Sequence, residues 1–388
     1  MRLTQLLGLI GAAVIALSGP SCATSPTTSK TPAEKADALL SGVIKANEPG
    51  VAVLVAQDGK ILFEKAYGLA DLEHQVPDTP QTTFRIASIT KQFTAAAILK
   101  LQEEGKLSVE DKLSKYLPDF PRGNEVTLRQ LLNHTSGIHD YSPAPDQLSE
   151  VAKPTTTVAE IELIKQQQPL YDFEPGTQWK YDNSGYELLG YIVEMVSGQS
   201  YGDFLRENFF EPLGMNDTGV YRLNLGLPHE ALGYILGKSG FEPPFYIDPS
   251  WTGGEGALYS TVEDLYRWNE GIFNGRVLDA TSLHAAFTPV ATNASQLNSG
   301  NGYGFGWSVG HYRGLRDIHH SGERPGFTSM VVRLPDEKFT VVVLANSDGI
   351  PNASANQLAY QLVDIFMADK LAPPDVANAS GSPKPATP

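Results

Sequence analysis

The sequence predicts an α+β fold, in which one antiparallel sheet is built from strands near both ends of the chain. Short runs rich in β-branched and aromatic residues occur early, at 51–57 and 60–68, and late, at 303–311, 328–335 and 339–346. The residues between them, 84–302, are typical of helices and loops. We therefore expect a sheet of these five strands with a large, mostly helical lobe inserted between its two halves.

Helices are predicted at both ends, where they can flank the sheet. Thr-Pro-Ala-Glu at 31–34 combines a capping box with proline in the first helical turn, and an apolar stripe follows it. Residues 354–366, SANQLAYQLVDIF, show the same amphipathic spacing. Asp58-Gly59 joins the first two strands with a strong two-residue hairpin signal.

Composition excludes several classes of function. The chain has 388 residues and a formal net charge of -15, so the phosphates of a nucleic acid would be repelled. The single cysteine rules out an internal disulfide framework and a zinc site built on cysteines. We expect no cofactor and no metal, and the sequence leaves the oligomeric state open.

The first 22 residues are typical of a signal peptide. Arg2 is followed by an apolar run at 6–17 that is too short to span a bilayer comfortably. Cleavage before Cys22 would yield a lipidated cysteine and a membrane tether, whereas cleavage after Ala23 would yield an ordinary exported protein. Either route places the protein in the periplasm or the cell envelope.

The N-terminal segment and the C-terminal end differ in composition from the region between them. Residues 23–31 are a polar linker rich in Ser, Thr and Pro, and residues 371–388 are a Pro/Ala/Ser tail with little to bury. We therefore expect one folded domain at 32–370 that contains the inserted lobe.

Ser88 and Lys91 are candidates for nucleophilic catalysis. Three positions apart on a helix, they share one face at about 5–6 Å. The helix that follows is apolar on nearly every side in its first half, so Lys91 is expected to be buried. Burial disfavours the charged form of a lysine, which could then take a proton from the serine. Alone, a Ser-x-x-Lys spacing has a high false-positive rate.

Two later segments contain further candidate catalytic and binding residues. Tyr181-Asp182-Asn183 sits in a loop just before an apolar-striped helix, and His320-Ser321-Gly322 lies on or beside a strand. In this order the three segments resemble the serine hydrolases of the class C β-lactamase and DD-peptidase superfamily, which carry Ser-x-x-Lys, Tyr-x-Asn and Lys- or His-x-Gly. The resemblance spans roughly residues 33–367 and agrees with the expected fold.

The resemblance assigns a role to each matching residue. Ser88 is the acylated nucleophile, and Lys91 and Tyr181 are the proton-transfer groups; which of the two is the base stays open, because coupled groups share their titration. Asn183 is expected to bind the substrate amide. His320 is expected to line the pocket opposite Tyr181.

The third segment also supplies backbone groups. The resemblance implies an oxyanion hole formed by the N–H groups of Ser88 and Glu323, the residue after His320-Ser321-Gly322. Lys238-Ser239-Gly240 is a rival match, but glycine and proline flank it and no closing strands follow. His319 and His320 should point to opposite faces of a strand, which excludes a metal site. His134 is expected to stabilise a turn.

Two departures from the β-lactamase pattern bear on the substrate. His320 stands where class C β-lactamases have lysine, so a fixed positive charge for a substrate carboxylate is missing unless the imidazole is protonated. No glutamate is placed as in class A enzymes to drive deacylation. We expect a small-molecule or short-peptide substrate and a DD-peptidase-like hydrolase, with a carboxylesterase or a weak β-lactamase as alternatives. A non-catalytic penicillin-binding or sensor domain is the alternative of another class.

Overall fold

The computed structural model describes residues 30–142, 148–291, 301–350 and 353–373. The expected signal peptide, the lipidation candidate Cys22, most of the linker and most of the C-terminal tail lie outside these residues, so they stay predictions. Within the described part of the chain, no helix is both long enough and apolar enough to cross a membrane. The described residues include the first three of the expected tail, of which Leu371 is buried against the terminal helices.

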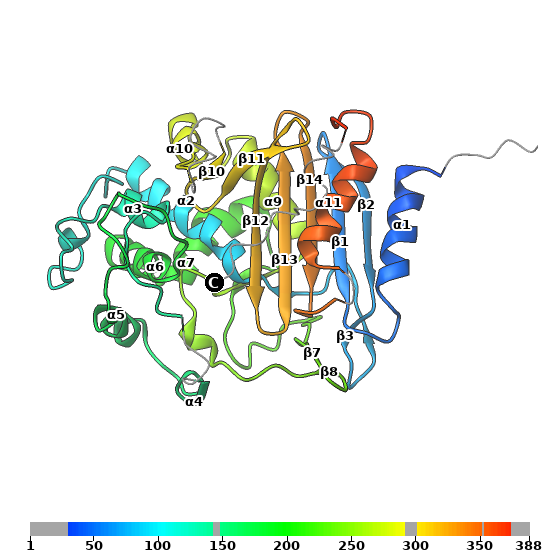
Figure 1. Cartoon of the computed structure of the whole chain (residues 1–388), viewed down its shortest axis with the longest axis horizontal. Helices are drawn as coiled ribbons and strands as arrows, with labels where there is room; N and C mark the ends of the chain where they lie inside the picture. The colour runs from blue at the N-terminus through cyan, green and yellow to red at the C-terminus, as the bar shows by residue number, and fades with distance from the viewer. Residues whose placement is uncertain (1–29, 143–147, 292–300, 351–352, 374–388) are drawn as a thin grey trace, which may run out of the picture.

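A seven-stranded antiparallel sheet forms the centre of the molecule and joins the two ends of the chain (Figure 1). The N-terminal strand β1 pairs along its whole length with the C-terminal strand β14, from Val51 opposite Ala345 to Gln57 opposite Phe339. The expected meeting of early and late strands is therefore confirmed. In spatial order the strands are β10 (Gly302–Tyr303), β11 (Ser308–Tyr312), β12 (Leu315–Arg324), β13 (Phe327–Leu334), β14 (Phe339–Ala345), β1 (Val51–Gln57) and β2 (Lys60–Tyr67).

The sheet has two strands more than the sequence predicts. The stretch 303–311 is divided into β10 and β11, because Gly306 turns the chain with a φ of 76°. The strand β12 was not among the five expected strands, although the sequence placed His320-Ser321-Gly322 on or beside a strand; its sequence LRDIHHSGER is too polar to be recognised as a central strand. It lies between β11, which pairs with it from Leu315 to His319, and β13, which pairs with it from Ile318 to Arg324.

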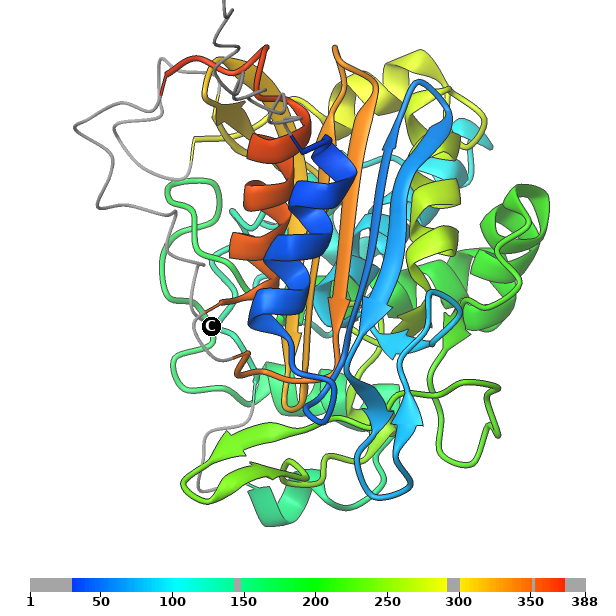
Figure 2. The ribbon, with the colours of Figure 1, turned by 90° about the vertical axis from the view of Figure 1, so that its right-hand side faces the viewer.

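Helices cover both faces of the sheet. On one face, α1 (Pro32–Val43) and α11 (Ala355–Phe366) pack side by side (Figure 2). Both begin with a capping box, formed by Thr31 with Glu34 and by Ser354 with Gln357. On the other face, α9 (Val262–Phe273) packs on β14 and β1. The flanking terminal helices are therefore confirmed.

The segment between the two halves of the sheet is mostly helical, as expected. Its central helix α2 (Thr90–Glu103) is buried along most of its length and packs against α6 (Ser184–Ser197). The remaining helices are α3 (Leu128–Leu132), α4 (Leu148–Val151), α5 (Thr157–Lys165), α7 (Tyr201–Leu205), α8 (Glu211–Leu213) and α10 (Ala280–Ala286). The short strands β5 (Phe84–Arg85), β9 (Leu258–Ser260) and β6 (Gly219–Val220) form one small sheet; β7 (Ile235–Gly237) pairs with β8 (Gly240–Glu242), and β3 (Leu69–Asp71) with β4 (Val76–Pro77).

One buried side chain ties these parts together. Asn346, directly after β14, is completely buried, and its Oδ1 accepts a hydrogen bond from the backbone N–H of Gly50 at 2.5 Å. Its Nδ2 lies 3.1 Å from the carbonyl oxygens of Leu69 and Ala70 and 2.8 Å from that of Leu232. The amide therefore links the last strand, the start of the first strand and the inserted lobe.

We predict that Asn346→Ala lowers the free energy of unfolding by about 2–4 kcal/mol, because it removes the several hydrogen bonds of a completely buried amide and each contributes about 0.5–1.5 kcal/mol. Urea denaturation followed by circular dichroism measures the change. The control is Asn274→Ala, which removes an exposed asparagine bonded only to Glu270. Equal stability of the two variants would show that Asn346 does not hold the parts together.

Candidate active site

The serine of the first motif lies at a strained turn. Ser88 is in a short 3-10 turn, Ala87–Ile89, that leads into α2, and its side chain is partly exposed. The preceding Ala87 has a φ of 47°, a left-handed conformation that is uncommon for any residue but glycine. Such strain costs on the order of 1 kcal/mol and persists only where its surroundings hold it in place. Nothing in the local sequence signals this turn.

The strand β12 holds that turn from the other side. A Cβ atom on Gly322 would lie 2.1 Å from the carbonyl oxygen of Ile86, so only glycine allows the strand to come this close. Ser329 of β13 places its hydroxyl 3.1 Å from the same carbonyl oxygen and 3.2 Å from that of Gly322. The third motif therefore contacts the backbone two residues before Ser88.

Lys91 is fully buried and lies one turn along from Ser88. Its Nζ is 3.2 Å from the Ser88 Oγ, 2.7 Å from the Asn183 Oδ1 and 3.0 Å from the carbonyl oxygen of Glu255. It also stands 4.9 Å from the centre of the Tyr181 ring. The structure thus brings together the serine, the lysine, the tyrosine and the asparagine that the sequence singled out.

Burial shifts the two candidate proton-transfer groups in opposite directions. It lowers the pKa of Lys91 to about 8, against the attraction of Glu255 and Asp140, so the neutral amine is accessible near neutral pH. It raises the pKa of Tyr181 well above its usual value, although a hydrogen bond with Ser88 opposes this shift. Tyr181 therefore keeps its proton where Lys91 loses one.

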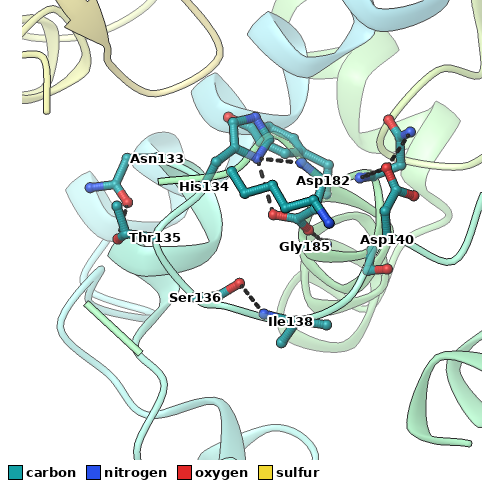
Figure 3. Close-up of polar contacts among 12 residues, drawn as sticks. Asn133, His134, Thr135, Ser136, Ile138, Asp140, Asp182 and Gly185 are labelled. Carbon is teal, nitrogen blue, oxygen red and sulfur yellow. Dashed lines mark hydrogen bonds and ion pairs between the residues drawn. The ribbon is translucent and has the colours of Figure 1, made fainter. Parts of the chain in front are cut away.

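The Asn183 side chain is held by groups that sequence reasoning missed. Its Oδ1 faces Lys91, while its Nδ2 donates to the Ser142 Oγ at 2.9 Å and to the Asp140 Oδ2 at 3.3 Å. Asp140 and Ser142 come from the loop after α3, where no spacing pattern marks them. Figure 3 shows Asp140 on one side of this network and Asp182 below His134.

His320 lies beside the tyrosine, but both of its ring nitrogens are engaged. The imidazole is 5% exposed, with its centre 6.3 Å from that of the Tyr181 ring. Its Nδ1 donates to the carbonyl oxygen of Ser321 at 2.5 Å, and its Nε2 accepts from the Tyr303 hydroxyl at 2.8 Å. Burial and the charge of Lys91 lower the pKa of His320 to about 3. Protonation of His320 then falls below the pH range in which Lys91 can act, so the imidazole carries no positive charge for a substrate carboxylate in that range.

The other residues of the third motif differ in their exposure to solvent. Ser321, Gly322 and Glu323 are consecutive in β12, with Gly322 buried and Glu323 exposed. The rival Lys238-Ser239-Gly240 is exposed at the turn of the β7–β8 hairpin. His319 faces away from His320, toward Tyr360 and Asp317.

His134 is closer to the site than the sequence suggested. It has a φ of 60° and is completely buried, as a turn-stabilising residue can be. Its ring centre is 4.4 Å from that of Tyr181 and 4.6 Å from that of Tyr303, and its Nδ1 is 3.3 Å from the Asp182 carboxyl (Figure 3). It therefore supports Tyr181 from behind. Within the described ranges, no group of three or more His, Cys, Asp or Glu residues is arranged to hold a metal ion.

The fold is mixed, with one antiparallel sheet and a mostly helical inserted lobe, and Ser88, Lys91, Tyr181 and Asn183 lie together in it. Residues 36–364 match the protein family described as Beta-lactamase. Because the match covers most of the chain, the protein belongs to the β-lactamase family.

Relatives of known name lie within the same group. Penicillin-binding protein 4* of Bacillus subtilis (strain 168) is 34% identical over 310 residues, which cover 76% of this chain and 68% of that protein. An octameric penicillin-binding protein homologue from Pyrococcus abyssi aligns with a TM-score of 0.77 and 29% identity, covering 87% of this chain and 79% of that one. A D-stereospecific amidohydrolase from Streptomyces sp. aligns with a TM-score of 0.73 and 25% identity, covering 86% and 98%.

We predict that Tyr303→Phe lowers the free energy of unfolding by about 1–3 kcal/mol, because it leaves the buried Nε2 of His320 without a donor. The pKa of His320 should also rise, since the lost hydrogen bond favours the neutral ring. Urea denaturation and an NMR titration of the histidines measure both changes.

The matched control is Tyr312→Phe, which removes a hydroxyl that donates to Asp364 in a partly exposed position. It should cost less than about 1 kcal/mol and leave His320 unchanged. An unaltered His320 titration in Tyr303→Phe would contradict the role given to Tyr303.

Proposed function

We propose that this chain is an exported serine hydrolase that forms an acyl-enzyme at Ser88 with small amide or ester substrates. The observation that carries the proposal is the Ser88 hydroxyl 3.2 Å from a completely buried lysine amine whose pKa is lowered to about 8. A neutral lysine has two N–H groups and one lone pair. With the N–H groups donated to Asn183 and to the Glu255 carbonyl, the lone pair is left for the serine hydroxyl.

The first step follows from this arrangement. Lys91 takes the proton of Ser88 while the serine oxygen bonds to the substrate carbonyl carbon, giving a tetrahedral intermediate and a lysine ammonium. The backbone N–H groups of Ser88 and Glu323 would stabilise the negative charge on the carbonyl oxygen. The strained turn at Ala87 and the close contact at Gly322 support this role, because they fix the first group relative to the strand that carries the second.

The leaving group needs a proton in the second step. Tyr181 is protonated, and it interacts with Ser88, so it can donate its proton as the bond to the leaving group breaks. The phenol then regains a proton from the Lys91 ammonium, whose Nζ stands 4.9 Å from the tyrosine ring centre. In deacylation, water takes the place of the leaving group and attacks the carbonyl carbon of the acyl-enzyme. The proton transfers among Tyr181, Lys91 and Ser88 then run in reverse. Asn183 would bind the substrate amide once its Nδ2 exchanges Asp140 or Ser142 for the substrate.

The proposed substrates are D-amino-acid peptides or cell-wall fragments, and export would bring the enzyme to them. Relatives named penicillin-binding proteins and a D-stereospecific amidohydrolase support this class. A carboxylesterase is the second candidate, and the neutral, buried His320 favours it over a β-lactamase. A lipidated Cys22 would tether the enzyme to a membrane. We propose no cofactor and no nucleic-acid partner.

We predict that a fluorophosphonate or a fluorescent penicillin labels Ser88. Mass spectrometry of the digested protein should find the added mass on the peptide that contains this residue, and Ser88→Ala should remain unlabelled. A variant at the neighbouring partly exposed serine of the third motif, Ser321→Ala, should still be labelled at Ser88. Label on another serine, or no label on the native protein, would favour an inert binding scaffold.

We predict that kcat/KM for a neutral p-nitrophenyl ester rises with pH and levels off above about pH 8, because the reactive form of Lys91 is the neutral amine and its pKa is about 8. Lys91→Ala should lower the rate by about 10²–10⁴-fold. Lys100→Ala, near the end of the same helix, is the control that should keep the profile. A rate that stays flat from about pH 6 to 9 would exclude Lys91 as the base.

A further inference from the structure

Two arginines close to the reactive serine have no acidic partner. Arg85 ends the short strand β5, three residues before Ser88, and Arg324 ends β12, one residue after Glu323. Among the residues that the structure describes, neither guanidinium makes a hydrogen bond or an ion pair, and the Nε atoms of both are buried. Arg85 makes one contact of another kind, with its Cζ 4.3 Å from the centre of the Tyr221 ring.

The positive charges of Arg85 and Arg324 also repel each other. The charge of Arg85 helps to lower the pKa of Arg324 well below its usual value, in addition to the larger effect of burial. Burial likewise lowers the pKa of Arg85 to about 10. Two buried like charges without a counterion are unfavourable unless an anion binds between them or beside them.

The neighbouring acids are occupied elsewhere. Glu230 accepts a hydrogen bond from the Tyr221 hydroxyl at 2.7 Å, and Glu255 accepts one from the Gly253 N–H at 2.8 Å. Tyr246 and Glu323 are exposed groups at the edge of this region. Elsewhere this chain does neutralise a buried arginine: Arg333, 3% exposed, pairs with Glu270 at 2.7 Å.

A shortage of acidic residues does not explain why Arg333 has an acidic partner while Arg85 and Arg324 have none. The chain has 44 Asp and Glu residues against 29 Lys and Arg, yet none of the described ones pairs with Arg85 or Arg324. The two arginine side chains are partly exposed, although their Nε atoms are buried, and neither makes an ion pair with Glu230 or Glu255. Such a pair is suited to a carboxylate, which it can bind with parallel hydrogen bonds.

The position of the pair indicates which part of a substrate it would meet. His320 and Arg324 are four residues apart on the strand β12, about 13 Å at the usual rise per residue. The expected oxyanion donor, the Glu323 N–H, lies between them and next to Arg324. A substrate whose reacting carbonyl binds there would extend toward His320 on one side and toward the arginines on the other.

We propose that Arg85 and Arg324 form a subsite for a carboxylate on the acyl part of the substrate. The proposal rests on the proposed acyl transfer at Ser88 and adds a substrate class to it: acyl groups that carry a free carboxylate. Because His320 supplies no positive charge, the arginine pair would bind the anion instead, at the opposite end of β12.

The test compares two p-nitrophenyl esters that differ only at the far end of the acyl chain. One is the mono-ester of adipic acid, which ends in a carboxylate, and the other ends in the corresponding primary amide. The native enzyme should favour the carboxylate ester in kcat/KM, mainly through a lower KM. Arg324→Gln should reduce that preference by about 10- to 100-fold, the usual effect of losing a hydrogen bond to a charged group, and leave the amide ester unchanged.

Two further variants separate recognition from folding. Arg324→Lys keeps the charge but loses the paired hydrogen bonds, so its preference should lie between those of the native enzyme and Arg324→Gln. Arg276→Gln removes the same charge from an exposed position in the loop after α9 and should keep the native preference. Because Arg324→Gln removes a repulsion, its melting temperature should equal or exceed that of the native protein.

A binding measurement decides the proposal even if neither ester is hydrolysed. Adipate should raise the melting temperature of the native protein, and of Ser88→Ala, more than that of Arg324→Gln. No turnover and no label at Ser88, with adipate binding intact, would refute the proposed function and keep the subsite. Equal binding by the native protein and Arg324→Gln, or equal loss of both esterase activities in Arg324→Gln, would overturn the subsite.

Discussion

The arrangement of the site depends on one buried amine. Lys91 has no carboxylate partner; its Nζ contacts a serine oxygen, an amide oxygen and a backbone oxygen, at 3.2, 2.7 and 3.0 Å. Neutral acceptors stabilise an ammonium less than a carboxylate does, and burial disfavours it further. The packing of α6, α7 and α10 against α2 imposes this burial. In the proposed mechanism, this burial is what allows Lys91 to act as a base.

The same close packing explains the shape of the nucleophile turn. Ala87 is held in a left-handed conformation, and Gly322 brings β12 against the carbonyl of Ile86. Neither feature has a stabilising purpose of its own, since one is strained and the other lacks a side chain. Together they set the reactive serine against the strand of the third motif. The Tyr303–His320 hydrogen bond completes this wall, and burial together with the charge of Lys91 keeps the imidazole neutral.

Much of this could be predicted from the sequence, and the omissions have physical reasons. The sheet halves and terminal helices were recognisable because their apolar periodicity is strong, and the three motifs were recognisable by their spacing. The strand β12 was missed because its residues are polar and only its neighbours make it a strand. Asp140, Ser142 and Tyr303 were missed because they reach the site only through tertiary packing. The unpaired Arg85 and Arg324 are also invisible in sequence, where an arginine shows its charge but not its lack of a partner.

The central claim is that the pKa of Lys91 is lowered to about 8, so that its neutral amine is accessible near physiological pH and serves as the base for Ser88. The most direct test is an NMR titration of the lysine side chains, with Lys91 assigned by comparison with Lys91→Arg. We expect one lysine to titrate with a pKa of about 8, well below the others, in the native protein. A Lys91 that stays charged to about pH 10 or above, as an ordinary lysine does, would contradict the account.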